Sequence, residues 1–261
     1  MPFPKRERFE YKKNQLDRVI CQLRYPPILK IDSEVPAKFQ EAIRQEYPLY
    51  IEKNEFPPDV SLGIKPQLIR ETQIQLGGSS KNHEFCNEDQ SWKINLTRTF
   101  LAVSTSKYRH REDFCEKFMK AYEKLLNIYE PPFFTRIGLR YTDVFVRSKL
   151  GLDGVKWTEL LQPPFLGLLS SDVSDEIRSS DSVYEVWLRD HECVVRIASS
   201  LAVDLKTKEQ CFIVDSDFFT TKRTSIEDVP DKLKFLQFNG SDLIQSIITS
   251  RLHDAMEPQK I

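Results

Sequence analysis

The sequence predicts an α+β fold in which antiparallel sheets carry helices packed on one face. Several segments alternate apolar and polar side chains with a period of two, which is typical of half-buried strands. Residues 111–129 instead repeat Phe114, Phe118, Tyr122 and Leu125 at the spacing of one helix face. Strands follow one another directly along most of the chain, and this order favours antiparallel pairing. Hydrophobic residues fill 40% of the 261 positions, which is enough for a large core.

Residues 1–150 are expected to form the first of two linked halves, a basic sheet-and-helix half. The period of two over 19–24 predicts its first strand, which the following prolines end because proline lacks a ladder N–H. In order, we expect a mobile charged arm over 1–15, a strand over 19–24, a helix over 33–47, an irregular connection over 51–66, a strand over 72–76, a turn over 77–82, strands over 92–96 and 100–106, a helix over 111–129 and a strand over 134–147.

Residues 151–261 are expected to form the second half, an acidic three-strand meander with a C-terminal helix. Paired prolines and a run rich in Ser and Asp over 151–182 suggest the boundary. Turn residues separate expected strands over 183–189, 193–205 and 210–220. After a break at Asn239-Gly240, Ser241 is expected to cap a helix that ends near Met256. Its apolar stripe is Leu243, Ile244, Ile247, Ile248 and Leu252.

The net charge of −1 conceals a difference between the two halves. Residues 1–150 carry 26 basic and 20 acidic side chains, whereas residues 151–261 carry 12 basic and 19 acidic ones. The basic half could meet an anionic partner such as nucleic acid. Alternatively, the two halves attract each other, within one chain or between copies.

The N-terminal sequence and the cysteines indicate a cytoplasmic protein. The first residues lack the apolar core of a signal peptide, and no stretch reaches the length of a membrane span. The five cysteines are odd in number, scattered and without a CxxC pair, which favours buried, reduced thiols. They are Cys21, Cys86, Cys115, Cys193 and Cys211.

No standard catalytic motif is present, and we expect no cofactor. The run Gly77–Lys81 imitates a phosphate-binding loop but lacks its first glycine and the helix after it. The histidines are far apart in the sequence and are expected to lie at the surface. They are His83, His110, His191 and His253.

Two aspartates offer a different hypothesis. Asp215 and Asp217 are two apart on an expected strand and therefore share a face, where they could hold a divalent ion with Asp204 from the neighbouring strand. This arrangement would suit a metal-dependent hydrolase. A solvent-facing strand end explains the same residues without any metal.

The arginines give the strongest indication of a binding surface. In the run 136–141, a period of two places Arg136, Gly138 and Arg140 on one face. Arg24 and Arg98 are expected to join them on the open face of the sheet, and Gly138 would leave room for a ligand. Guanidinium groups bind carboxylate and phosphate bidentately. The alternative is an arginine ladder paired with Asp and Glu across strands.

Three stretches carry a resemblance to a known family. Val19–Leu29 (Val-Ile-Cys-Gln-Leu-Arg-Tyr-Pro-Pro-Ile-Leu), Arg136–Tyr141 (Arg-Ile-Gly-Leu-Arg-Tyr) and Asp242–Met256 resemble a sporadically distributed family of uncharacterised bacterial proteins. That family has an asparagine soon after the second stretch, where this sequence has Thr142 and Asp143. The resemblance implies a soluble bacterial protein, with no reaction, cofactor or ligand assigned. The patchy distribution implies carriage on mobile-element or defence loci.

These observations favour a non-catalytic interaction protein. Its arginine-lined sheet face, made by Arg24, Arg98, Arg136 and Arg140, is expected to meet an anionic protein partner or a second copy of the chain. The alternatives are the hydrolase at Asp215 and Asp217, and nucleic-acid binding by the basic half. No metal and no membrane contact is expected.

Overall fold

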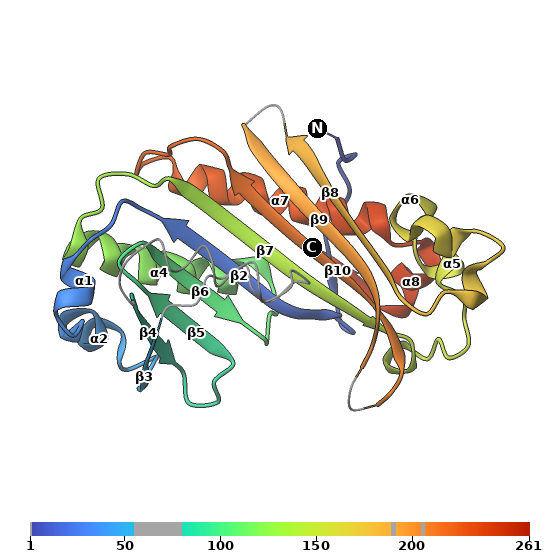
Figure 1. The fold of residues 1–261 in the computed structure, drawn as a ribbon, viewed down its shortest axis with the longest axis horizontal. Coiled ribbons are helices and arrows are strands. Elements are labelled where there is room, and N and C mark those ends of the chain that lie inside the picture. Colours follow the sequence, from blue (N-terminus) through green and yellow to red (C-terminus); the bar gives the residue numbers. More distant parts are fainter. Residues whose placement is uncertain (1, 55–79, 189–191, 205–206) are drawn as a thin grey trace.

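A computed structural model describes residues 2–54, 80–188, 192–204 and 207–261, and it confirms the α+β fold (Figure 1). Nine strands form one sheet in the order β3-β4-β5-β6-β2-β7-β10-β9-β8, with every neighbouring pair antiparallel. The strands of this sheet are β2 (Leu16–Arg24), β3 (Leu49–Asn54), β4 (Lys81–Cys86), β5 (Trp92–Leu96), β6 (Phe100–Thr105), β7 (Arg136–Val146), β8 (Ser180–Leu188), β9 (Cys193–Val203) and β10 (Gln210–Thr220). Two short strands, β1 (Phe9–Tyr11) and β11 (Pro258–Lys260), pair with each other outside it.

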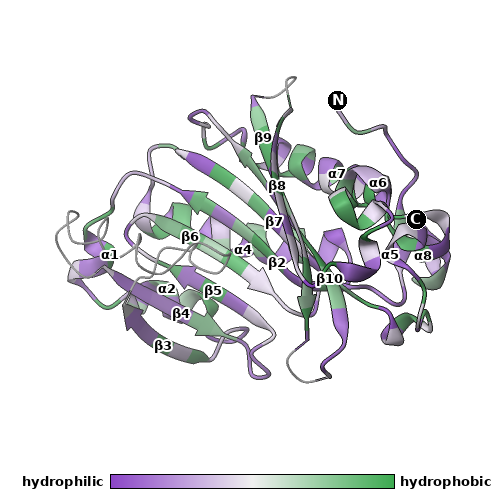
Figure 2. Ribbon diagram, turned by 45° about the vertical axis from the view of Figure 1, so that its right-hand side comes forward, coloured by the Kyte–Doolittle hydropathy of each residue, from purple (hydrophilic) through white to green (hydrophobic). Residues whose placement is uncertain are grey.

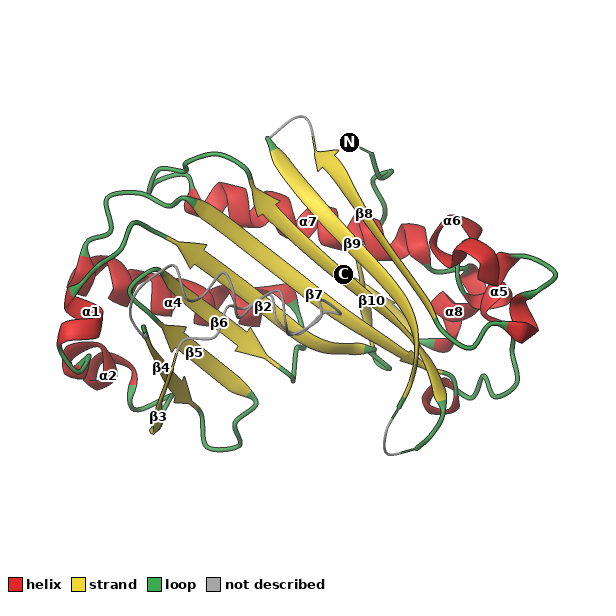
Figure 3. Ribbon diagram, in the orientation of Figure 1, coloured by secondary structure: helices red, strands yellow, loops and turns green. Residues whose placement is uncertain are grey.

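Helices lie behind this sheet and at its two ends (Figure 3). The helices are α1 (Lys30–Ser33), α2 (Ala37–Ile43), α4 (Arg111–Tyr129), α5 (Trp157–Leu160), α6 (Pro163–Leu166), α7 (Val229–Ile247) and α8 (Ser250–Ala255), with short 3-10 turns η2 (Ser148–Leu150), η3 (Gly167–Ser170) and η4 (Ser174–Glu176). None of the helices in these described ranges has the length and apolar character needed to cross a membrane.

The pairing of β7 with β10 joins residues 1–150 to residues 151–261. Leu139 on β7 lies opposite Phe218 on β10, and Phe145 lies opposite Phe212. Both predicted halves therefore contribute strands to the same sheet. The predicted strands over 92–96, 100–106, 134–147 and the three-strand meander are all present, with ends shifted by a few residues.

The two long helices cover one face of the sheet (Figure 1). On α4, Phe114, Phe118 and Leu125 are fully buried, as the helical spacing predicted. Alternation along the strands places apolar side chains toward these helices and polar ones on the opposite face, as the banding of β2 and β7 shows (Figure 2). We call the face that α4 and α7 leave uncovered the open face.

Helix α7 corrects the predicted break at Asn239-Gly240. The helix continues through both residues to Ile247, and the chain breaks instead at Ile248, after which Thr249 caps α8. Asn239 is compatible with the helix because its side-chain amide donates to the carbonyl oxygen of Phe235. At Gly240 a Cβ atom would lie 2.7 Å from the ring of Tyr141, so the glycine lets the helix approach the sheet. Its role is close packing rather than helix termination.

The N-terminal arm and β3 are further corrections. Residues 9–11 were expected to be mobile, but β1 pairs with β11 near the C-terminus. Part of the expected irregular connection is β3, which pairs with β4 at the edge of the sheet. Lys81 and Asn82 belong to β4 rather than to a turn. The strand expected over 72–76, and the turn over 77–79, lie outside the described residues.

Replacing Phe118 with alanine tests the packing of α4. The side chain is 0% exposed, so Phe118→Ala should lower the free energy of unfolding by about 3–5 kcal/mol, since the deletion leaves a cavity. Urea denaturation measures the change. Glu123→Ala, at an exposed position on the same helix, is the control and should stay within about 0.5 kcal/mol of wild type. Equal losses in the two variants would refute this packing.

Candidate functional site

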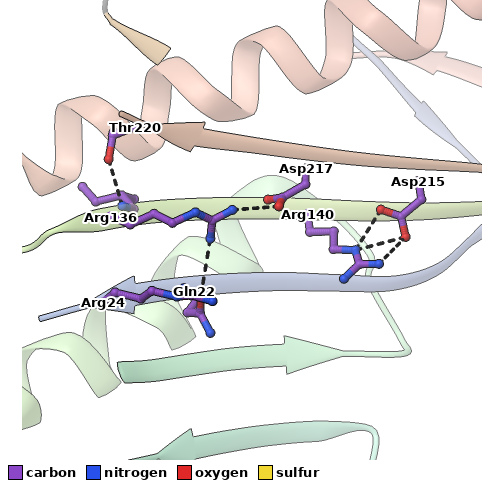
Figure 4. Close-up of polar contacts among 8 residues, drawn as sticks. Gln22, Arg24, Arg136, Arg140, Asp215, Asp217 and Thr220 are labelled. Carbon is purple, nitrogen blue, oxygen red and sulfur yellow. Dashed lines mark hydrogen bonds and ion pairs between the residues drawn. The ribbon is translucent and has the colours of Figure 1, made fainter. Parts of the chain in front are cut away.

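The arginines of β7 lie on the open face, as predicted from their spacing. Arg136 is opposite Arg24 on β2, and Arg140 is opposite Ile20. The residues between them on the other face, Ile137 and Leu139, are buried in the core. The alternation of strand side chains therefore holds both guanidinium groups on the same side of the sheet (Figure 4).

Arg140 forms a bidentate ion pair with Asp215 of β10. Its Nε donates to Oδ1 at 2.8 Å, and its Nη2 donates to Oδ2 at 2.8 Å. Thr142 donates a further hydrogen bond to Asp215 at 3.3 Å. The Asp215 side chain is only 3% exposed, so its charge depends on these partners.

Arg136 is held by a second set of contacts. Its Nη2 donates to Oδ2 of Asp217 at 2.7 Å, and its Nη1 donates to Oε1 of Gln22 at 3.4 Å (Figure 4). Arg24 donates to the same Gln22 oxygen at 2.9 Å, and the Arg136 guanidinium lies 4.6 Å from the ring centre of Phe219. Burial raises the pKa of Asp217, although the neighbouring arginines oppose that shift. These contacts match the predicted alternative of an arginine ladder paired across strands.

Gly138 has a different role from the one expected. We expected it to leave room for a ligand, but a Cβ atom there would lie 2.3 Å from Nη1 of Arg136. The glycine therefore makes space for the Arg136 side chain, which folds back over its own strand toward Gln22.

Arg98 does not join the other three predicted arginines. It lies in the turn between β5 and β6 and pairs with Asp32 on α1 at 3.5 Å. The period of two that groups Lys93, Asn95 and Thr97 would place Arg98 on the face of Leu96 if the strand continued, and the strand ends at Leu96.

Asp215 and Asp217 share a face, as predicted, but each carboxylate faces an arginine. Asp204 was expected to lie beside them, but it follows the end of β9 at Val203. The β9 residue opposite Asp215 is Ala198. A positive guanidinium on each carboxylate disfavours a divalent cation between them. The geometry therefore gives no support to the hydrolase alternative.

A second cluster of side chains has atoms of the kind that coordinate metal ions. Glu10, His110 and Glu112 each offer one such atom within 4.8 Å of the others. Nδ1 of His110 is already the acceptor for the backbone N–H of Asp113 and so caps α4. We therefore assign His110 to capping.

Register adds two arginines that sequence reasoning missed. Arg18 lies opposite Thr142, and Arg196 lies opposite Asp217. We call the resulting set the arginine strip. Its members are Arg18, Arg24, Arg136, Arg140 and Arg196. Facing these five positive charges, β10 places Asp215 and Asp217 on the open face, and Glu185 on β8 lies opposite Arg196. A further exposed aspartate, Asp17, precedes Arg18 at a register shift of β2. Arg18 is in phase with Arg24 on β2, so alternation along that strand could have revealed it. Arg196 is distant in sequence from residues 136–140, and only the strand order brings it to them.

The histidine and cysteine predictions have different outcomes. His83 was expected at the surface but is fully buried, where it bonds the carbonyl oxygen of Ile31 at 3.1 Å and the hydroxyl of Tyr50 at 2.9 Å. Burial lowers its pKa. His191 lies outside the described residues. All five cysteines are free, four are buried, and burial raises the pKa of every thiol, which disfavours a reactive thiolate.

Asp143 is a further polar residue that sequence reasoning missed. It lies on the helix-covered face of β7, opposite Val214. The residue is 6% exposed, and burial, with a smaller contribution from the charge of Asp215, raises the pKa of its carboxyl to about 7. Its place among apolar positions on β7 gave no signal of function in the sequence.

No protein-family model matches the sequence, and no curated protein is significantly similar to it. The function must therefore be argued from the geometry of the chain itself.

The Arg140–Asp215 pair should contribute strongly to stability. Arg140→Ala leaves a buried carboxylate without its ion pair, so the free energy of unfolding should fall by about 3–5 kcal/mol. Chemical denaturation measures the loss. The control is Lys156→Ala, which breaks an exposed ion pair with Asp175 and should cost no more than about 1 kcal/mol. An Arg140→Ala variant as stable as this control would show that the pair is not structural.

Asp143 should make stability depend on pH. Its folded pKa is raised, so the folded protein holds a proton that the unfolded chain releases, and stability falls as the pH rises from about 4 to about 7. Between pH 5 and pH 8 the wild type should lose about 2 to 3 kcal/mol relative to Asp143→Asn. Urea denaturation of both proteins at the two pH values provides the comparison. Parallel pH dependences would contradict the raised pKa.

Proposed function

We propose that the protein is a non-catalytic interaction module whose open face binds an acidic protein partner. The observation that carries this proposal is Trp187, an aromatic side chain that is 62% exposed on the same face as the arginine strip. Tryptophan and arginine are the residues most often found at the energetic centre of protein interfaces.

The surroundings of Trp187 support a protein partner. Register aligns Trp187 with Val194 on β9 and Phe219 on β10, and the next row contains Glu185, Arg196 and Asp217. An apolar row therefore runs beside a charged one. This mixture favours a protein surface over a nucleic acid, which would be bound mainly by basic groups.

The edge of the sheet adds a second contact. β8 is the last strand of the sheet, and no described strand pairs with its outer side. Val183, which is 53% exposed, shares the open face with Trp187. An extended segment of a partner could pair with this edge and place its acidic side chains over the arginine strip.

The positive charge of the strip gives the preference for an acidic partner. Arg136 and Arg140 are paired with aspartates, so their substitution would damage the fold before it reported on binding. Arg18 is exposed, and Arg196 is partly exposed. These arginines, rather than the pair on β7, are the ones to substitute in a binding test.

The test compares partner capture by variants of the open face. The full chain is immobilised, bound proteins are recovered from cells of the source organism after nuclease treatment, and affinity is measured with the purified partner. Trp187→Ala and Arg196→Ala should each weaken binding at least about tenfold, while the melting temperature stays close to that of wild type. The control is Leu168→Ala, at an exposed apolar side chain on η3.

Three results would contradict the proposal. A partner that binds both open-face variants as tightly as wild type would place the interface elsewhere. Steeply salt-dependent oligonucleotide binding that ignores Trp187 would favour the nucleic-acid alternative. Sedimentation that shows a dimer disrupted by Trp187→Ala, with no other protein captured, would identify a second copy of the chain as the partner.

A further inference from the structure

A cavity of about 490 Å³ lies on the side of the sheet opposite the arginine strip. Its inner wall is the helix-covered face of β7 and β10, and α7 forms a second wall. The segment that leads into α4, strand β1 and the C-terminal residues Met256 and Ile261 border the rest. A volume of this size is typical of sites for small organic molecules.

Asp143 is the charged group of the inner wall. Its carboxyl borders the cavity, and it makes no hydrogen bond or ion pair with any residue in the described part of the chain. Burying a carboxylate without a partner is costly, and this cost accounts for its raised pKa. A buried ionisable group that faces a cavity and lacks a partner is characteristic of ligand sites.

The basic residues at the cavity do not neutralise Asp143. Arg8 pairs with Asp242 at 3.2 Å and also donates to the carbonyl oxygen of Phe238. Arg111 pairs with Glu112 at 2.7 Å. Both guanidinium groups are therefore engaged with other acceptors, and Arg109, the third basic residue of the lining, is exposed and does not pair with Asp143 in the described part of the chain. When Asp143 ionises, a bound cation supplies the positive charge that these three arginines do not.

Aromatic rings supply the remaining recognition chemistry. Rings attract cations through their negative faces and also cover apolar surface. The cavity is bordered by five of them, Phe9, Tyr11, Tyr108, Tyr141 and Phe238. Tyr11 is fixed by a hydrogen bond of 2.8 Å between its hydroxyl and His253, so β1 contributes an ordered wall.

We propose that this cavity binds a small organic amine, with its ammonium group on Asp143 and its apolar body against the aromatic rings. A hard metal ion fits poorly at Asp143, because a site for calcium or magnesium gathers several oxygen ligands, and the other carboxylates of the lining, Glu10 and Glu112, group with His110 rather than with Asp143. A carboxylate or phosphate ligand would be repelled by the ionised Asp143. An ammonium ion on an apolar body matches both the charge and the walls.

The test uses amines and their neutral isosteres on the full chain. Benzylamine and 2-phenylethylamine are each compared with the corresponding alcohol by isothermal titration calorimetry and by the shift in melting temperature. Wild type should bind at least one amine with one-to-one stoichiometry, and at least about 30-fold more tightly than the alcohol of the same shape, because removing one partner of a desolvated charge pair costs this much or more.

Asp143→Asn identifies the group responsible. The amide is nearly isosteric and carries no charge, so this variant should fold and lose the preference for the amine over the alcohol. The control is Asp181→Asn, which removes an exposed carboxylate on β8 and should bind the amine like wild type.

A second variant keeps the test informative if Asp143→Asn is unstable. Ile244 lines the cavity from α7, so Ile244→Trp should fill part of the space and abolish binding of the larger amine. Equal binding of amine and alcohol, an unchanged amine affinity in Asp143→Asn, or no saturable binding of either amine would each overturn the proposal. Because the cavity and the open face lie on opposite sides of the sheet, none of these results bears on the acidic partner.

Discussion

The structure depends on the register of β7, the strand on which the two halves of the chain meet. β7 pairs with β2 on one side and β10 on the other, so each of its side chains is committed to one face. Ile137 and Leu139 enter the core only if Arg136 and Arg140 remain on the open face. A slip of one residue would exchange these sets and bury two guanidinium groups, so the core and the charges both oppose such a slip.

The same pairing explains much of the charge difference between the halves. The basic half (1–150) and the acidic half (151–261) are joined by ion pairs between β7 and β10 and by ion pairs near the paired terminal strands β1 and β11. The pairs between the halves are Arg8–Asp242, Lys13–Glu257, Arg136–Asp217, Arg140–Asp215 and Lys260–Glu7. Four of these pairs join a base of the first half to an acid of the second, as attraction between the halves within one chain predicts, and the basic half carries less unpaired charge than its composition indicates.

Local patterns predicted the elements, and long-range contacts explain what was missed. α4 was predicted with its full bounds because its apolar spacing and caps lie within the helix itself. The continuation of α7 through Gly240 depends on Tyr141, a contact that no window of sequence contains. The same holds for the candidate site. Spacing placed Arg136 and Arg140 on one face, but only strand order could add Arg196, remove Arg98 and bring Asp215 to Arg140.

Alternation along β7 also places two kinds of polar chemistry three residues apart, on opposite faces of the sheet. Arg140 faces Asp215 on the open face, whereas Asp143 faces the cavity behind the sheet. The charge of Asp215 nevertheless reaches Asp143, since it contributes to the raised pKa of that carboxyl. Arg140 offsets part of this charge by holding both oxygens of Asp215. Strand β7 thus carries a structural ion pair on the open face and the charged group of the cavity on the helix-covered face.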